Sequence, residues 1–464
     1  MRRLFAVGGA LVSLWFGAVP AAADEVESTK VYTDHPRLFL RTQRLRLLRR
    51  ETGRDSLRWE QFHLLMSGGA PMDEPGFADA LYFRATDDPT AARRAIDWAL
   101  APNRDTRQVA LVYDWCQEQL KPAEKQTLLR TLKTAASQRP AQTSIGDLRS
   151  QLLAAIAIAG DDDQASQAAI QYVLHDQWRG NLLPALRAGR LEWKPGDTYP
   201  LYEIFHAVRD NLNADLREDF MAYFSQFPLF DLLSYYPPPF PAAENEFRIP
   251  WSPAPGEPDL RVAALSRAAE LAMVAFDTNA PESQVLQGWL MNDRFLMRGV
   301  FGNPYEFLWA NPYQPGLSYY HVPLVMYDEA LGRLLVRSSW EDDAMWAGMI
   351  GGQLQQFRDG HVIVIDPKTG REPLDLDEAA ILFPAQSKHF VSGKKPANDV
   401  FLVGLEHMAS FHVEPDDEEM EEVSTDHEGV LYLKGVRPEI QVRLTPRLNA
   451  SRSGEAGPGV ETNR

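Results

Sequence analysis

The sequence changes its periodicity near residue 320, and this change constrains the fold more than any other feature. Upstream of it, apolar residues recur at helical spacing. Downstream, segments such as Gly332-Arg-Leu-Leu-Val-Arg-Ser-Ser-Trp340 read as strands. Spacings of 3.6 and of 2 residues belong to different kinds of element. The pattern predicts a multidomain protein, with a helical domain over residues 24–316 followed by an antiparallel β domain over residues 317–447.

The upstream part is a series of helix hairpins with short polar turns. Residues 77–85 and 90–100 form one predicted pair, joined by Asp87-Asp-Pro89, and residues 145–159 and 164–178 form another. Regular hairpins of this kind imply an α/α barrel or solenoid. Because no strict repeat is present, we favour an α/α toroid over a repeat array.

The downstream part shows the apolar and polar alternation of half-buried strands. We expect an antiparallel sheet or sandwich, with a hairpin turn at Asp366-Pro-Lys-Thr-Gly370. Residues 448–464 are rich in Gly, Ser and Glu and predict a disordered tail. The predicted strands cover residues 332–340, 361–366, 400–403, 409–413, 430–433 and 441–444.

The first residues have the form of a bacterial export signal. Arg2 and Arg3 precede an apolar run from Leu4 to Val19, and Pro20-Ala-Ala-Ala23 offers a cleavage site. The run is shorter than the roughly 20 apolar residues that a membrane span needs. We therefore predict a signal peptide over residues 1–23 and a mature protein that is periplasmic or secreted, with no membrane span.

Charge and cysteine content narrow the function. The formal net charge is −17, which makes nucleic acid an unfavourable partner. An acidic ligand would need a local basic patch against this overall field. The stretch from Arg179 to Lys194, which also holds Arg187 and Arg190, is the best such patch in the sequence. Cys116 has no partner for a disulfide, and its helical context predicts a buried side chain.

Several short motifs resemble the heparinase II/III and alginate-lyase type of polysaccharide lyase. They are His35-Pro-Arg-Leu-Phe39, Tyr113-Asp-Trp115, Gly160-Asp161, Leu335-Val-Arg-Ser-Ser-Trp340 and Asp343-Ala344. The resemblance implies an incomplete α/α toroid followed by an antiparallel β-sandwich. It also implies that the partner is an acidic, uronate-containing polysaccharide.

Such a lyase removes a proton next to a carboxylate, so it needs a base, an acid and a group that neutralises the carboxylate. The segment 196–206 is similar to the catalytic-tyrosine helix of the family. The resemblance implies that Tyr202 and His206 are catalytic, and their spacing of four places both on one helical face. Tyr199 shares this face if Pro200 starts the helix, and we expect it to bind substrate.

The remaining site residues are expected at the junction of the two domains. There His361 would be a third catalytic group, and Arg337 and Trp340 would approach the substrate from the β side. Either Arg149 or Arg179 would neutralise the substrate carboxylate, since Arg forks suit carboxylates.

Two departures from the family pattern leave other functions open. Residues 143–149 replace the Asn and His that grip the uronate, and Asp359-Gly-His361 replaces closely spaced His ligands, so no metal site is expected. No phosphate loop, His-Glu-x-x-His or paired-cysteine motif occurs, and we expect no cofactor. The alternatives are an inverting glycoside hydrolase, with Asp147 and either Asp197 or Glu203 as its carboxylates, and a non-catalytic glycan-binding envelope protein.

Overall fold

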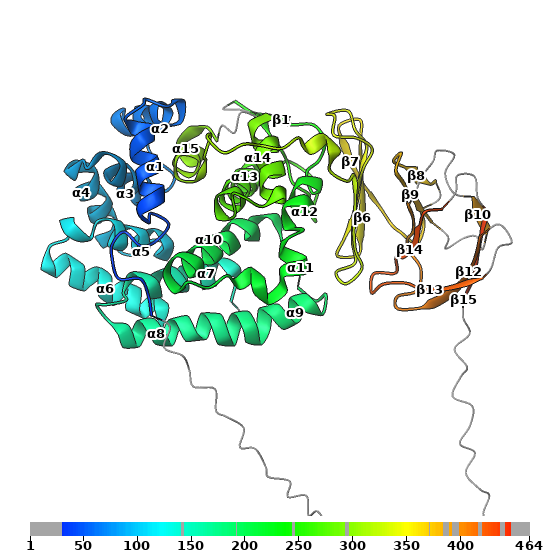
Figure 1. Cartoon of the computed structure of the whole chain (residues 1–464), viewed down its shortest axis with the longest axis horizontal. Helices are drawn as coiled ribbons and strands as arrows, with labels where there is room; N and C mark the ends of the chain where they lie inside the picture. The colour runs from blue at the N-terminus through cyan, green and yellow to red at the C-terminus, as the bar shows by residue number, and fades with distance from the viewer. Residues whose placement is uncertain are drawn as a thin grey trace, which may run out of the picture.

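The computed structural model of the chain confirms the predicted order of helices first and strands second (Figure 1). The predicted signal peptide and tail lie outside the residues that it describes. The described residues are 30–140, 143–191, 193–243, 246–292, 297–370, 372–383, 389–391, 399–415, 420–436 and 441–446.

Helix hairpins make up the first part, as predicted. A π-helical stretch, η2 (Tyr172–Leu182), links α8 to α9, and short 3-10 turns are η1 (Gln117–Gln119), η3 (Leu216–Phe220) and η4 (Tyr319–His321). The α-helices are α1 (Thr42–Thr52), α2 (Leu57–Ser67), α3 (Pro75–Thr86), α4 (Pro89–Leu100), α5 (Thr106–Trp115), α6 (Pro122–Ala136), α7 (Ile145–Ala157), α8 (Asp163–Gln171), α9 (Leu183–Arg187), α10 (Pro195–Leu212), α11 (Met221–Phe224), α12 (Phe227–Leu233), α13 (Leu260–Phe276), α14 (Pro281–Asn292) and α15 (Gly299–Trp309).

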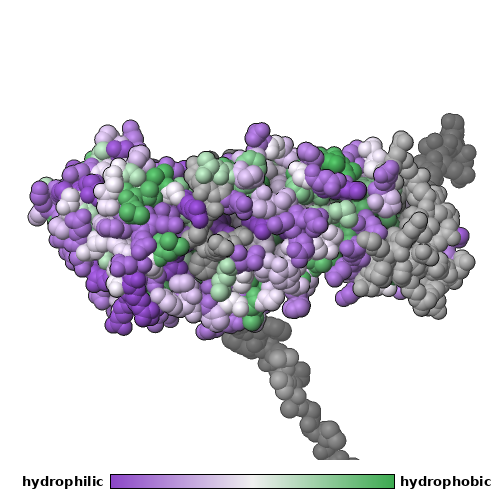
Figure 2. Space-filling view, turned by 90° about the horizontal axis from the view of Figure 1, so that it is seen from above, coloured by the Kyte–Doolittle hydropathy of each residue, from purple (hydrophilic) through white to green (hydrophobic). Residues whose placement is uncertain are grey.

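Six of these helices form an inner ring. Around the ring, α3, α5, α7, α10, α13 and α15 each contact the next, and α15 also contacts α3 and α2. Helices α4, α6, α8 and α14 pack outside this ring against their hairpin partners. Polar residues cover much of the face seen in Figure 2, with apolar residues in small patches among them. The helical part is therefore an α/α toroid with a packed inner layer.

The inner helices begin at the same end of the ring, and acidic side chains cap two of them. At the start of α7, the Ser144 hydroxyl accepts from the Asp147 backbone N–H at 3.1 Å, and the Asp147 carboxylate accepts from the Ser144 N–H at 3.2 Å. At the start of α10, Asp197 accepts from the Lys194 N–H at 3.2 Å. These bonds satisfy helix donors that would otherwise lack a partner.

The motifs near the N-terminus hold α1 on the opposite end of the ring. The buried Asp114 carboxylate, at the end of α5, accepts from the backbone N–H groups of Arg37 and Leu38 at 2.9 and 2.8 Å. Trp115 Nε1 donates to the Leu38 carbonyl at 2.9 Å. Arg37 in turn donates to the carbonyl of Ile156, in the last turn of α7, and to that of Ala159, just past its end. These bonds bring α1 beside the C-terminal ends of the inner helices.

Among its described residues, the second part forms three sheets, whose orders are β3-β4-β5-β6-β7, β14-β11-β9-β8 and β10-β15-β12-β13. A short hairpin, β1 (Phe240–Pro241) with β2 (Glu246–Phe247), belongs to the helical part. The strands are β3 (Val325–Asp328), β4 (Arg333–Arg337), β5 (Trp346–Ile350), β6 (Gln353–Arg358), β7 (His361–Ile365), β8 (Leu374–Asp375), β9 (Ala379–Leu382), β10 (His389–Val391), β11 (Asp399–Leu402), β12 (Ser410–Pro415), β13 (Glu421–Ser424), β14 (Leu431–Lys434) and β15 (Gln441–Pro446).

The sheets stack as layers with an apolar core between each pair. Leu334 and Met349 are register partners in the first sheet, and they pack with Phe401 of the second sheet. Another core, which includes Leu444, lies between the second and third sheets. Most of the described strand pairs are antiparallel, as predicted, but β9 and β11 run parallel. The chain crosses from β9 to β11 instead of turning back directly.

Two details of the strand prediction are corrected. Residues 366–370 do form a turn, closed by the Gly370 N–H on the Asp366 carbonyl at 3.0 Å. The turn does not make a hairpin, because β7 pairs with β6 and β8 pairs with β9. Strands β8, β9, β10 and β13 were not predicted from the sequence, and neither were β5 and β6. They pair with each other around a turn at Gly351 and Gly352, two glycines with positive φ.

The first sheet packs directly on the helical part (Figure 1). Trp346 Nε1 donates to the Leu233 carbonyl at 2.7 Å, and the Tyr236 hydroxyl donates to Gln355 at 2.7 Å. At Gly189, which has φ +66°, a Cβ would lie 2.0 Å from the Ala330 carbonyl oxygen. Only glycine fits this close approach. The predicted boundary at 316/317 falls between Trp309, the end of α15, and Val325, the start of β3, and its exact position stays a prediction.

Candidate functional site

The predicted catalytic pair lies inside the helical core. Tyr202 is 2% exposed and packs against Phe205, Phe227 and Phe276. His206 is 1% exposed. Both side chains are thus enclosed by protein and do not line a groove, and a catalytic role for them stays a prediction. Burial also raises the pKa of Tyr202, which keeps the phenol protonated.

His206 has the contacts of a neutral, structural imidazole. Its Nε2 donates to the Ala272 carbonyl at 2.9 Å, and its Nδ1 accepts from Arg209 at 3.1 Å. The ring packs on Trp309 at a centroid distance of 4.5 Å. Burial, followed by the charges of Arg209 and Arg44, lowers the pKa of His206 well below its ordinary value. His206 therefore acts as a hydrogen-bond acceptor that holds the Arg209 guanidinium in position.

Tyr199, predicted to bind substrate, belongs to a buried network at the N-terminal end of the ring. Its hydroxyl donates to Glu203 at 2.8 Å. Arg107 holds the same carboxylate through two nitrogens, at 2.9 and 2.7 Å. Arg149, the predicted carboxylate-binding arginine, donates to the other Glu203 oxygen at 2.9 Å. These arginines keep the pKa of Glu203 below its ordinary value in spite of burial.

The same network extends to α15 and to the start of α3. Glu74 accepts from Arg107 at 2.9 Å and from the Tyr305 hydroxyl at 2.7 Å. Trp309 Nε1 donates to the Tyr199 hydroxyl at 3.0 Å. Two glutamates thus neutralise the arginines here. We name Glu74, Arg107, Arg149, Tyr199, Glu203, Tyr305 and Trp309 the carboxylate network.

The carboxylates of the hydrolase alternative are engaged in structural bonds. Asp147 and Asp197 accept the capping bonds of α7 and α10. Glu203 is 0% exposed and paired with two arginines. An inverting hydrolase needs one free acid and one base with room for water between them. The observed bonding of these three side chains does not favour that chemistry.

The other predicted residues are spread over the molecule. Arg337 and Trp340 lie together, with the guanidinium 5.0 Å from the ring centre, but Arg337 is 1% exposed and donates to the carbonyls of Ser339 and Tyr235. His361 is exposed at the start of β7. Arg179 is exposed on the helical part and pairs with Asp219 at 3.3 Å. Their substrate-binding roles stay predictions.

A cavity of about 660 Å³ opens at the other end of the ring, where α1 meets the C-terminal ends of α10 and α13. Asp210 is the one carboxylate in its described lining, and Thr42, Gln43, Thr278 and Asn311 add polar groups. We name this cavity the arginine cleft after its four cationic residues, Arg41, Arg44, Arg50 and Arg209.

Three of these arginines have no carboxylate within ion-pair distance among the residues described. Arg41 donates to the Asp210 carbonyl and stacks on Tyr32. Arg44 donates to the Leu308 carbonyl at 3.0 Å, and its guanidinium lies 4.7 Å from the ring centre of Trp309. Arg50 lies 4.6 Å from the ring centre of Tyr313. Their positive charges are therefore largely uncompensated.

The start of α1 adds to this positive field. Its N-cap residue, Arg41, makes no capping side-chain bond, and its first turn holds no acidic residue. A helix N-terminus carries about half a positive charge and free N–H donors. Burial lowers the pKa of Arg44 to about 10, so its guanidinium remains protonated at neutral pH. The cleft has the electrostatics of an anion site.

No site residue was predicted from the sequence in the basic segment 41–50. The spacing of Arg41 and Arg44 was visible, because residues three apart share a helix face. Their approach to Arg209 was not visible, since it depends on the anchoring of the N-terminal segment onto α5 and α7.

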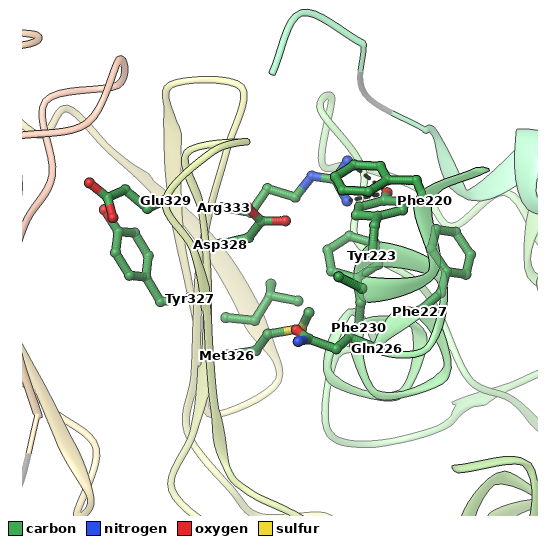
Figure 3. A pocket seen from close by; sticks show the side chains of 12 residues that line it. Phe220, Tyr223, Gln226, Phe227, Phe230, Met326, Tyr327, Asp328, Glu329 and Arg333 are labelled. Atoms are coloured by element: carbon green, nitrogen blue, oxygen red, sulfur yellow. Dashed lines mark hydrogen bonds between the residues drawn. The ribbon is translucent and has the colours of Figure 1, made fainter. Parts of the chain in front are cut away.

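A second cavity, of about 280 Å³, lies between α11–α12 and the strands β3–β4 (Figure 3). In Figure 3, Met326, Asp328 and Arg333 point from the strands toward the helices, whereas Tyr327 and Glu329 lie on the other side of the sheet. Phe227 of this wall also packs on Tyr202. We name it the junction cavity, and its lining consists of Phe220, Ala222, Tyr223, Gln226, Phe227, Phe230, Met326, Tyr327, Asp328, Glu329, Arg333 and Leu335.

Within the described ranges, no group of three His, Cys, Asp or Glu side chains is placed to hold a metal ion. Over the same ranges, no helix combines the length and apolar character that crossing a membrane requires. Cys116 is buried, as predicted, and burial raises the pKa of its thiol.

Comparisons with known proteins find a weak structural likeness. No protein-family model and no curated protein matches the chain. A crystal structure of a mutant heparan sulfate lyase, HepC from Pedobacter heparinus, matches over 81% of this chain and 76% of that chain. The sequence identity is 12% and the TM-score is 0.36. A likeness at this level assigns neither a family nor an activity to this protein.

Proposed function

We propose that this protein is exported and binds an acidic, uronate-containing polysaccharide in the arginine cleft, as a polysaccharide-lyase-like protein that holds its ligand without cutting it. The observation that carries the proposal is the set of uncompensated guanidinium groups in a chain of net charge −17. Placing Arg41, Arg44 and Arg50 together with no carboxylate within ion-pair distance among the described residues is costly unless an anion completes the site.

The size and lining of the cleft suit a sugar acid. Its volume of about 660 Å³ is within the range of about 300–1,000 Å³ that is usual for ligand pockets. Guanidinium forks of Arg44 and Arg50 match the geometry of a carboxylate. The side chains of Thr42, Thr278 and Asn311 can bond sugar hydroxyls.

The same lining argues for binding over β-elimination. Elimination requires a base near the proton that is removed, and the described lining of the cleft contains neither Tyr nor His. Tyr202 and His206 are each 2% exposed or less. Eliminated products carry a conjugated double bond that absorbs in the ultraviolet. Incubation with a panel of uronates should therefore give binding without new ultraviolet absorbance, in the wild type and in Tyr202→Phe alike.

Isothermal titration of the mature chain tests the binding proposal. The probes are an oligogalacturonate and a neutral oligosaccharide of equal length. We expect tighter binding of the acidic probe, and we expect this preference to shrink as salt is added, since salt screens exposed charges. Arg44→Gln and Arg50→Gln should each weaken acidic binding by about tenfold, which corresponds to about 1.4 kcal/mol.

Arg46→Gln is the matched control. Arg46 lies on the same helix, is exposed and does not line the cleft. Its loss changes the net charge equally and should leave affinity within about twofold, because exposed charges outside a site are screened. Equal losses in Arg46→Gln and Arg44→Gln, or equal affinity for both probes, would contradict the proposal.

A further inference from the structure

Strand β7 lies at one edge of the first sheet and lacks the usual protection of an edge. Among the described residues it pairs only with β6. Its sequence, His-Val-Ile-Val-Ile, contains no Asp, Glu, Lys, Arg, Pro or Gly. Ile363 and Val364 are 49% and 50% exposed. Because successive side chains of a strand point to opposite faces, β7 exposes apolar surface on both of its faces.

The other edge strands of the described sheets are protected by short length or by charge. β8 and β10 have two and three residues. β3 ends in Asp328, β13 begins with Glu421-Glu422, and β14 ends in Lys434. Short strands and charged side chains keep sheet edges from pairing with other chains. β7 has neither, so its edge is open to pairing.

The turn before β7 determines which of its backbone groups face outward. The two-residue turn Asp359-Gly360, with positive φ at both positions, joins the register partners Arg358 and His361. Such a turn is closed by a hydrogen-bonded pair, and bonded and non-bonded pairs alternate along an antiparallel ladder. The first, third and fifth residues of β7 therefore bond to β6. The N–H and C=O groups of Val362 and Val364 point away from the sheet, where they have no partner among the described residues.

This edge is complementary to itself. The outward-facing groups are centred on Ile363, and the segment Val362-Ile-Val364 reads the same in both directions. In an antiparallel pair with a twofold axis at Ile363, Val362 of each copy faces Val364 of the other, and the outward groups of both residues gain partners. β-branched side chains pack well against cross-strand neighbours on a pleated surface.

The charges beside the strand fit the same pairing. Asp359 precedes β7 and contacts Arg358 at 3.4 Å, and Lys368 follows β7 without an ion pair among the described residues. Asp366 is already bonded within its own turn, to the Lys368 N–H at 2.9 Å and the Thr369 hydroxyl at 3.2 Å. Antiparallel pairing brings Asp359 of each copy near Lys368 of the other, whereas parallel pairing would place like charges together. Charge complementarity therefore favours an antiparallel second copy.

We propose that β7 pairs with β7 of a second copy of this chain, in an antiparallel dimer with a twofold axis at Ile363. Each copy has this edge once, so the pairing covers it and association stops at two. A contact between five-residue strands is small beside the roughly 1,200–2,000 Å² of a stable interface. The dimer is therefore weak, with a Kd on the order of 10–100 μM.

Sedimentation velocity of the mature chain across this concentration range tests the proposal, and the fraction of dimer should rise with concentration. Ile363→Lys places like charges directly opposite each other and should raise the Kd by at least about tenfold. Lys368→Glu should raise it by about threefold, because Asp359 of the other copy then meets a like charge. Leu64→Lys is the matched control: it replaces another exposed apolar side chain, on α2 at the far end of the helical part (Figure 1), and should leave the Kd within about twofold. Thermal unfolding checks that each variant is folded.

Disulfide trapping tests the register. In a non-hydrogen-bonded antiparallel pair the Cα atoms lie about 4.5 Å apart, a distance that a disulfide spans, so mild oxidation should link two copies of Ile363→Cys. Val364→Cys is the matched control, because its two new thiols lie diagonally across the pair, beyond the roughly 7 Å between Cα atoms that a disulfide can bridge. Cys116 is buried and does not compete. The proposal is overturned if the chain stays monomeric across the range, if Ile363→Lys and Leu64→Lys weaken association alike, or if both cysteine variants cross-link equally well.

Discussion

The two ends of the inner helical ring use the same residue type with opposite consequences. At the N-terminal end, Arg107 and Arg149 are neutralised by Glu203, and Arg107 also contacts Glu74. At the C-terminal end, the described contacts of Arg41, Arg44 and Arg50 are with backbone carbonyls and aromatic rings. At the N-terminal end, glutamates of the protein neutralise the arginines. At the C-terminal end, the positive charges of the arginines face a cavity without such partners among the described residues.

This difference shows that the number of arginines is a poor guide to a binding site. The carboxylate network contains the residues that sequence reasoning selected, Tyr199 and Arg149, yet both already bond to Glu203. The arginine cleft was not selected from the sequence, although its Arg41, Arg44 and Arg50 have no carboxylate within ion-pair distance among the described residues. A residue that stabilises the fold already has partners, whereas a residue that binds ligand lacks one until the ligand arrives.

The largest effect is expected from Glu203→Gln. The change leaves Arg107 buried with its main counter-charge removed, and breaking a buried pair from one side costs about 3–5 kcal/mol of unfolding free energy. Urea unfolding of the wild type and the variant measures this. The matched change at the other end, Asp210→Asn, should cost less than about 1 kcal/mol, because the pair with Arg209 is partly exposed. An equal loss of unfolding free energy in Glu203→Gln and Asp210→Asn would contradict the proposed difference between the two ends of the ring.

The second prediction concerns a carboxyl beside the network that lacks a guanidinium within ion-pair distance among the described residues. Glu306 is 2% exposed and accepts from the Met297 N–H. Burial raises its pKa from 4.5 to about 7. Its contribution to stability is therefore present below about pH 4.5 and is lost as the pH rises to about 7, at about 1.4 kcal/mol per unit of pKa shift.

The Glu306→Gln variant has no ionisable group at this position. Its unfolding free energy therefore does not show the fall that ionisation of Glu306 causes in the wild type. The unfolding free energy of the variant minus that of the wild type should therefore rise by about 3 kcal/mol between pH 4.5 and pH 8. Chemical denaturation at several pH values, with one protein concentration throughout, gives the difference directly. A difference that stays flat with pH would show that Glu306 is ionised in the native state at neutral pH, as Glu203 is.

The third prediction separates a structural from a ligand-binding role for Arg149. Arg149→Gln removes one of two guanidinium partners of Glu203 and should cost about 2 kcal/mol of stability, the usual value for a hydrogen bond to a charged group. Affinity for the oligogalacturonate should stay within about twofold, as in the Arg46→Gln control. A tenfold loss of affinity with unchanged stability would instead place the substrate carboxylate at Arg149.

The smallest effect is expected at Asp210. Asp210→Asn removes the one carboxylate in the described lining of the arginine cleft, so an acidic ligand should bind about threefold more tightly, which corresponds to less than about 1 kcal/mol. Titration at low salt gives the best sensitivity, and the gain should fade at high salt. Weaker binding in Asp210→Asn would mean that Arg209 needs this partner to hold its position.

Much of the fold could be predicted from the sequence because periodicity is a local property. The helix hairpins, the change near residue 320 and the strands β4, β7, β11, β12, β14 and β15 follow from apolar spacing. The strands β5 and β6 escaped prediction because Gly348, Gly351 and Gly352 interrupt their pattern. The parallel pairing of β9 with β11 also escaped, because pairing direction depends on the path of the chain between strands.

The site could be predicted only in part. The sequence showed Tyr202 and His206 to share a helical face, but a shared face can point into a core or into a groove. Tyr202 packs on Phe227, which lines the junction cavity. His206 accepts a hydrogen bond from Arg209, which lines the arginine cleft. Each predicted residue thus supports a cavity wall without lining the cavity.

What the sequence alone determined is the order of helix and strand and the apolar faces that build the cores, because these depend on neighbours a few residues away. Only the tertiary structure decided which charges are balanced. Arg107 meets Glu203 across 96 residues of sequence, and Arg41 meets the Asp210 carbonyl across 169. Coulomb energies depend on distance in space, so an arginine becomes structural or ligand-binding only when the chain has folded around it.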